Sequence, residues 1–121
     1  MERTMRAIKV YLAGPMRGYP EFNFPAFDKG AAYLRTAGFE VFSPAEKGLE
    51  KHAEANQESL AFRRAVFALD MAWICEHADL VALLPGWEKS TGARAEKALA
   101  EAIGLEVRFI DPETGAFTDA I

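Results

Sequence analysis

Asp70 is the first residue whose surroundings suggest chemistry. It is the only charged residue in the apolar run AVFALDMAWIC, and in a helix its neighbours one turn further on are Trp73 and Ile74. An isolated ionised carboxylate is costly to remove from water. We therefore expect Asp70 to reach a partner, a pocket or the helix end. A structural hydrogen bond and a functional site explain this position equally well.

Glu96 is the second such residue. It follows the stretch WEKSTG, where a predicted helix begins. At about 100° per residue, Glu96 shares its stripe with Leu99 and Ile103, which is the face that should pack. Counting three residues on from any cap between positions 90 and 92 does not reach position 96, so a capping box is excluded. We interpret Glu96 as a candidate site residue. The alternative is stabilisation of the helix macrodipole.

Two carboxylates from different helices suggest a limited set of reactions. Retaining glycoside chemistry needs two carboxyl groups about 5 Å apart, one as the nucleophile and one assisting protonation or sugar positioning. The bond between base and sugar in a nucleoside is also glycosidic. Metal-dependent hydrolysis would need more Asp, Glu or His ligands. One cysteine and two histidines are too few for a Cys- or His-built metal site, so we predict neither metal nor cofactor. Cys75, with apolar neighbours, is predicted to be a buried thiol.

Two glycine-containing loops could bind an anion. In YLAGPMRGYP, Gly14 and Gly18 do not match the dinucleotide pattern GxGxxG. Together with Arg17 they could still surround a phosphate or ribose, or form a plain turn. In WEKSTG, the triplet at 89–91 lacks the glycines of a phosphate-binding P-loop, so an ATPase is not predicted. The amides of Ser90 and Gly92 at a helix N-terminus would nevertheless favour an anion.

Aromatic residues occur near these loops. Phe22, Phe24 and Trp87 are predicted to be packing residues, although a loop aromatic beside a ligand can also stack on a base. Tyr11 lies inside an expected strand, where an aromatic residue is ordinary.

The elements that must position these residues alternate between strand and helix. Apolar runs and turn residues predict strands at 7–14, 39–44, 79–86 and 105–111, and helices at 25–38, 58–78 and 91–104. Residues 45–57 are expected to form a polar surface loop, and the tail from 112 is ambiguous. This order predicts an α/β fold, a Rossmann- or flavodoxin-like three-layer sandwich with a parallel sheet of four to five strands. Ligands then bind beyond the carboxyl ends of the strands, in the loops after Ala13, Phe42 and Leu84.

Length and charge limit the number of domains and the classes of partner. The 121 residues, half of them hydrophobic, are enough for a single domain spanning 1–121. A formal charge of -4 gives no general attraction to nucleic acid polymers or anionic membranes, although local donors could bind a small anion. No apolar run has the length of a signal peptide or a membrane helix, so we expect a cytoplasmic protein.

Three motifs carry a family resemblance. VYLAGPMRG, ALDMAWICEHADLVALL and STGARAEKALAEAIG together resemble the nucleoside 2-deoxyribosyltransferase superfamily, which includes the 2'-deoxynucleoside 5'-phosphate N-hydrolases. The chain is most similar to a small bacterial and phage branch, for which FNFPAF, SPAE and LPGWEKSTGARAE are typical. The resemblance extends from Lys9 to about Ile110.

The resemblance implies a five-stranded parallel α/β sheet, a homodimer or larger homo-oligomer, and cleavage of an N-glycosidic bond through a covalent sugar–carboxylate intermediate. It gives Glu96 the role of nucleophile, Asp70 that of positioning the sugar and assisting protonation of the leaving base, and Tyr11 a place beside the nucleophile. The residues matching the loops that hold a 5'-phosphate are Gly14, Arg17, Gly18, Ser90 and Gly92.

Two departures leave alternatives open. The hydrolases often have a serine where this chain has Pro15, which removes a hydroxyl group and an amide donor. The spacing from Gly92 to Glu96 resembles the transferases instead. Hydrolase and transferase therefore both remain, with a nucleoside or nucleoside 5'-monophosphate as the expected partner. The rival hypothesis is a non-catalytic nucleotide-binding or signalling module that uses the same cleft. A purely structural oligomerisation domain is a third.

Overall fold

A five-stranded sheet forms the centre of the protein, which we describe from a computed structural model covering residues 7–46 and 59–118. Most of the predicted polar loop at 45–57 lies outside the described residues. The strand order is β2-β1-β3-β4-β5. The strands are β1 Lys9–Ala13, β2 Glu40–Phe42, β3 Leu80–Leu83, β4 Glu106–Ile110 and β5 Phe117–Thr118.

Four of the five strands are parallel. β1 pairs with β2 and β3, and β3 pairs with β4, all in parallel. The ambiguous tail supplies β5, which runs antiparallel to β4. A tight turn explains this direction, because the amide of Gly115 donates to the carbonyl of Asp111 and the connection is too short for a parallel crossover.

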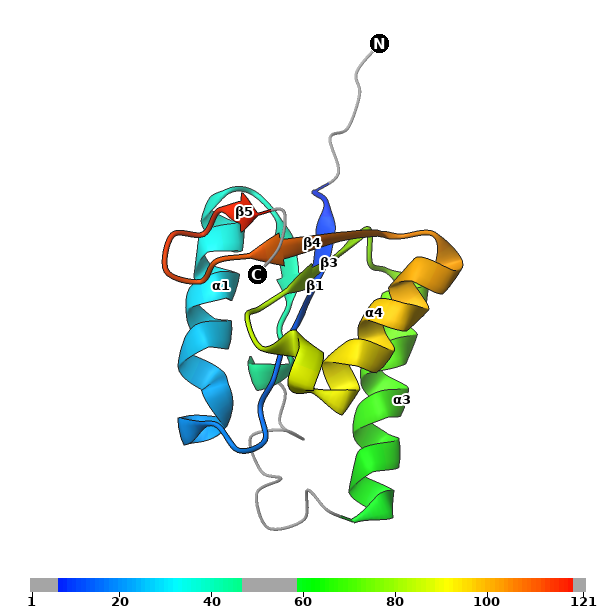
Figure 1. Ribbon diagram of the computed structural model, residues 1–121. Coiled ribbons are helices and arrows are strands. Elements are labelled where there is room, and N and C mark those ends of the chain that lie inside the picture. Colours follow the sequence, from blue (N-terminus) through cyan, green and yellow to red (C-terminus); the bar gives the residue numbers. More distant parts are fainter. Residues whose placement is uncertain (1–6, 47–58, 119–121) are drawn as a thin grey trace.

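Helices cover both faces of the sheet, as the predicted three-layer sandwich requires. They are α1 Phe24–Thr36, α3 Leu60–Glu76 and α4 Thr91–Ile103, with short 3-10 turns η1 Pro20–Asn23, η2 Pro44–Glu46 and η3 Trp87–Lys89. α1 covers one face, and α3 and α4 lie together on the other (Figure 1). The N-terminal half of α3 extends past the end of the sheet (Figure 1).

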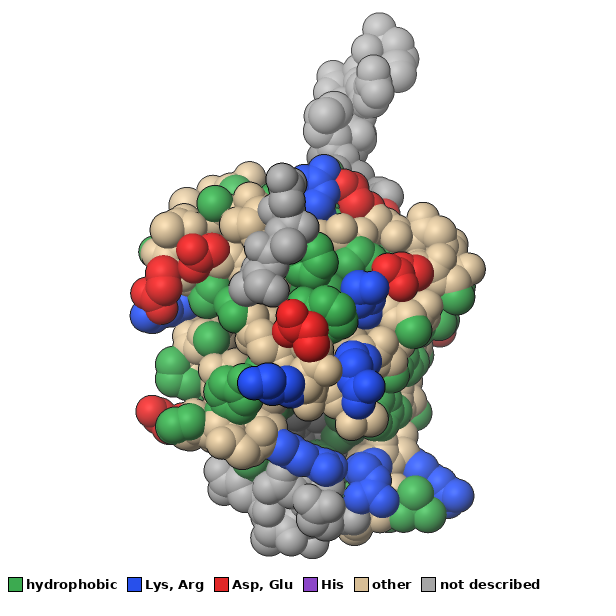
Figure 2. Space-filling model, in the orientation of Figure 1, with side chains coloured by type: hydrophobic (Ala, Val, Ile, Leu, Met, Phe, Trp, Pro, Cys, Tyr) green, Lys and Arg blue, Asp and Glu red, His purple; other side chains and the backbone are tan. Residues whose placement is uncertain are grey.

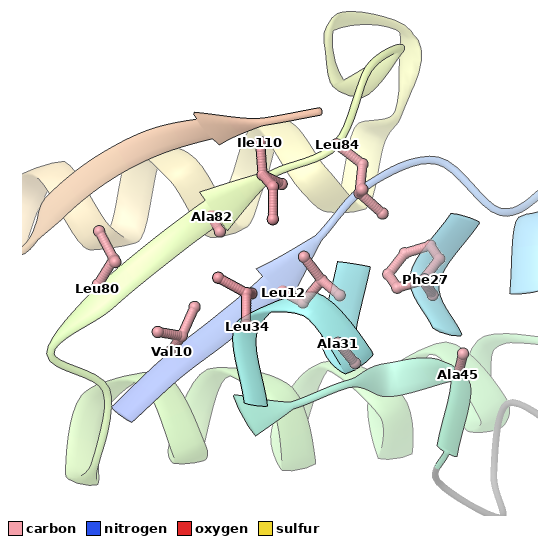
Figure 3. Packing of buried hydrophobic residues seen from close by; sticks show 10 residues of the cluster. All are labelled: Val10, Leu12, Phe27, Ala31, Leu34, Ala45, Leu80, Ala82, Leu84 and Ile110. Carbon is pink, nitrogen blue, oxygen red and sulfur yellow. The ribbon is translucent and has the colours of Figure 1, made fainter. Parts of the chain in front are cut away.

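Strand alternation divides the core between the two faces. Val10 and Leu12 of β1 pack toward α1, in the cluster drawn in Figure 3. Tyr11 and Ala13 point to the opposite face, where the second cluster joins the sheet to α3 and α4. The side of β1 that carries Tyr11 is therefore the side that faces Asp70 and Glu96.

Local capping sets where the two site helices begin. The hydroxyl oxygen of Ser59 accepts a hydrogen bond from the amide of Phe62, and that of Ser90 accepts one from the amide of Ala93. α4 ends at Gly104, whose φ of 88° lies in the left-handed region that favours glycine.

One prediction about the helices is wrong. Cys75 is exposed rather than buried. Apolar residues occur on every side of α3, and Cys75 lies on the side that the described residues leave uncovered. Within the described residues, no helix is both long and apolar enough to cross a membrane.

Candidate active site

The strand order creates a crevice between β1 and β3. The chain leaves β1 toward β2 and later leaves β3 toward β4, so the loops after these neighbouring strands diverge. A Cβ atom added to Gly14 would lie 2.9 Å from the Cβ of Leu84. Only glycine allows the two strand ends to approach this closely.

A cavity of about 540 Å³ opens at this crevice. Its size is that of a small-molecule site. The loops after β1, β2 and β3 all contribute to the wall, and so do α3 and the start of α4. All three predicted loops therefore meet at one site.

Glu96, Asp70 and Tyr11 converge beneath this cavity. The Tyr11 hydroxyl donates a hydrogen bond of 2.8 Å to Oε2 of Glu96. Asp70 also acts on that hydroxyl, by its charge and by side-chain hydrogen bonding. Glu96 and Asp70 line the cavity while only 7% and 3% exposed. Two carboxylates from separate helices thus meet at one phenol.

Tyr11 is held rigidly and stays protonated. The side chain is fully buried, with its ring stacked on Phe42 at a centroid distance of 5.3 Å and tilted against Trp73 at 6.4 Å. Burial, and then the charges of Glu96 and Asp70, raise the pKa of Tyr11 well above its ordinary value. The phenol therefore acts as a hydrogen-bond donor to carboxylate rather than as an anion.

The position of Glu96 in α4 is not explained by the helix dipole. α4 begins at Thr91, so Glu96 is its sixth residue, beyond the first turn. The dipole effect on a side chain fades within that first turn. Glu96 lies on the buried face, as its stripe predicts, and its contact is with Tyr11 rather than with the helix end.

The predicted phosphate-binding residues are only partly brought together. Gly14, Arg17, Ser90 and Gly92 line the cavity. Gly18 is not among the lining residues and instead makes a turn, with a φ of 81°. A Cβ atom on Gly92 would make only ordinary contact, 3.7 Å from Phe67 Cζ, so packing does not demand glycine there.

Sequence reasoning missed two further basic residues that line the cavity. Arg63 comes from α3 and Lys89 from η3. The signal for Arg63 was available, because it lies two helical turns before Asp70 and so shares its face. In the lower part of the view in Figure 2, Lys and Arg side chains gather, although the chain as a whole has a formal charge of -4.

Among the charged residues that line the cavity, three are basic and two are acidic. Arg17, Arg63 and Lys89 stand on the wall together with the carboxylates of Glu96 and Asp70. Across residues 7–46 and 59–118, no group of three or more His, Cys, Asp or Glu side chains is placed to hold a metal ion.

Comparison with solved structures gives the class. The chain is similar to the 2-deoxyribosyltransferase of the psychrotolerant bacterium Bacillus psychrosaccharolyticus, with a TM-score of 0.65 and 28% identity over 86% of this chain and 72% of that one. The fold and this likeness place the chain in the nucleoside 2-deoxyribosyltransferase-like superfamily. Residues 8–109 match DUF4406, described as a domain of unknown function, and the chain belongs to that family. No curated protein matches the sequence.

Proposed function

We propose that the protein cleaves or transfers the N-glycosidic bond of a nucleoside or (deoxy)nucleoside 5'-monophosphate through a covalent glycosyl–Glu96 intermediate. The observation that carries this proposal is the buried group of Glu96, Tyr11 and Asp70 at the floor of a cavity of small-molecule size. The likeness to a 2-deoxyribosyltransferase supports the same reaction class.

The first step forms the intermediate. The Glu96 carboxylate attacks the anomeric carbon, a carbon–oxygen bond forms, and the bond to the base breaks. The base leaves with the bonding electron pair and takes a proton from solvent, a transfer that Asp70 assists. The Tyr11 hydroxyl holds the nucleophilic carboxylate in one orientation, because its hydrogen bond fixes Oε2.

The second step decides between hydrolysis and transfer. Water or a second base attacks the same carbon, the Glu96 carboxylate is released, and the proton of the incoming nucleophile passes to Asp70. Both outcomes use one intermediate, so one site can support either.

The walls of the cavity support recognition of a 5'-phosphate. The first amides of α4 have no partner inside the helix, and the positive end of its dipole lies at the cavity. Arg17, Arg63 and Lys89 approach from three different elements. These groups offset the amide that Pro15 cannot donate.

A substrate panel tests the proposal. Purified protein is incubated with nucleosides and with their 5'-monophosphates, with and without a second base, and free and exchanged base are followed by chromatography. We expect base release or exchange from at least one member. If ligands bind but no base is released or exchanged, the non-catalytic nucleotide-binding module becomes the better description.

A further inference from the structure

The segment Pro20–Asn23, between β1 and α1, has an unusual backbone. Glu21, Phe22 and Asn23 have φ values of 53°, 56° and 60° and ψ values of 32°, 25° and 17°. All three lie in the left-handed helical region, which side chains of L-residues disfavour and which they rarely enter consecutively. Such strain persists only where the surroundings impose it, and it concentrates at functional sites.

Several contacts hold this left-handed turn in place. The Asn23 side-chain amide donates to the carbonyl of Pro15 at 3.0 Å, and the amide of Phe22 donates to the carbonyl of Tyr19 at 3.0 Å. Tyr19 packs closely on Gly86, since a Cβ atom there would lie 2.5 Å from the tyrosine oxygen. The turn is thus tied both to the loop after β1 and to the loop after β3.

The result of this geometry is the position of Phe22. Its side chain is half-buried and lines the cavity, whereas the ring of Phe24, in edge contact with it at 6.0 Å, packs against the core on the α1 side. Phe27, the other phenylalanine of this wall, is 1% exposed and belongs to the core. Phe22 is therefore the phenylalanine of this wall with surface left to offer a ligand.

An apolar face of a helix lines the same cavity as this loop. α3 lines it with Phe62, Val66 and Phe67, on the helix that also carries Asp70. The basic residues and the N-terminus of α4 supply the anion-binding part of the same cavity. A flat aromatic group with an anionic tail would meet both the apolar and the cationic side chains that line this cavity.

We propose that Phe22 is a base-binding residue that stacks on the leaving base, with the left-handed turn fixing its ring against the cavity. This inference rests on the proposed function for the identity of the ligand. Stacking is available to every base, because each has an aromatic face. The turn thereby positions the base while Glu96 and Asp70 act on the sugar.

Binding measurements separate this role from general packing. Calorimetry is performed on the full chain carrying Glu96→Gln, so that ligands are not consumed, with the four 2'-deoxynucleoside 5'-monophosphates and with 2-deoxyribose 5-phosphate, which has no base. We expect Phe22→Leu to weaken binding of at least the tightest nucleotide roughly 5- to 150-fold, the range of base–aromatic stacking. Affinity for the sugar phosphate should change less than about twofold, and Phe22→Tyr should retain nucleotide affinity.

Phe24→Leu is the matched control, because it shortens the neighbouring ring outside the cavity, and it should leave nucleotide affinity unchanged. Equal losses for nucleotide and sugar phosphate, no loss for any nucleotide, or absence of nucleotide binding by the parent protein would overturn the proposal. If Phe22→Leu does not fold, the proposal is tested by nuclear Overhauser contacts between base protons and the Phe22 ring in the parent complex. The absence of these contacts would also overturn the proposal.

These outcomes are distinct from the fate of the proposed reaction. Lack of base release by the wild-type protein would remove the catalytic function and leave the stacking result standing. Conversely, an active enzyme insensitive to Phe22 would remove only this inference.

Discussion

Glu96 forms its hydrogen bond with Tyr11 across 85 positions of sequence. A buried carboxylate is costly unless a donor compensates it, and the phenol supplies one. The same contact orients the Glu96 carboxylate at the cavity that it lines. A nucleophile held in one orientation reaches a bound sugar without first having to be ordered.

At the residue scale, we predict that Glu96→Gln abolishes base release. The amide has nearly the same shape and can still accept from Tyr11, but it cannot form the sugar ester. We expect the rate to fall by roughly 10³-fold or more, as when other nucleophiles are removed. Chromatography of free base gives the rate, and circular dichroism checks the fold.

Glu101→Gln is the control for that experiment. Glu101 lies on the same helix but is exposed and paired with Lys97 at 2.8 Å, so its loss should cost under about 1 kcal/mol of stability and no activity. Full base release by the Glu96→Gln protein would refute the assignment of the nucleophile.

At the element scale, the start of α4 and the end of β1 use glycine for different reasons. Gly14 is required by the approach of Leu84, whereas nothing closer than 3.7 Å opposes a Cβ atom on Gly92. Space left open at a helix N-terminus that lines a cavity is available for an anion. We therefore expect Gly14 to serve packing and Gly92 to serve ligand binding.

We predict that Gly92→Ala leaves the free energy of unfolding unchanged or raises it by up to about 1 kcal/mol, because alanine favours helix. Affinity for 2-deoxyribose 5-phosphate should fall roughly tenfold or more, the usual effect of one misplaced carbon in a fitted site. Gly14→Ala should instead destabilise by about 1–3 kcal/mol through overpacking. Urea unfolding and calorimetry measure the two effects, and unchanged affinity in Gly92→Ala would exclude an anion there.

At the scale of the whole molecule, burial of Tyr11 links stability to alkaline pH. Its folded pKa is raised above the ordinary value of about 10, so above that pH the unfolded chain loses the phenol proton while the folded protein retains it. The stability that the protonated Tyr11 contributes to the folded state is fully present below about pH 10. It is lost as the pH rises, by about 1.4 kcal/mol per pH unit.

We therefore predict that wild-type protein loses stability more steeply than Tyr11→Phe between pH 10 and pH 11. The other tyrosines are common to both proteins and cancel in the comparison. Urea unfolding at pH 8, 9, 10 and 11 measures the difference. Parallel curves for the two proteins would show that Tyr11 does not keep its proton.

The sequence by itself was enough to predict the fold. Strand and helix alternation gave the three layers, and the positions of the loops after Ala13, Phe42 and Leu84 gave the edge where the cavity lies. Local patterns carry this information because periodicity and turn residues act over a few positions. Helical spacing also placed Glu96 on the inner face.

Only the tertiary structure decided which distant groups meet. Tyr11 looks like an ordinary strand residue until β1 is set beside α3 and α4, because its partners are 59 and 85 positions away. The exposure of Cys75 and the direction of β5 depend on what covers a helix and how short a turn is. The left-handed turn at Phe22 is held by the bond from Asn23 to Pro15, next to Tyr19 packed on Gly86, and no local propensity contains these contacts.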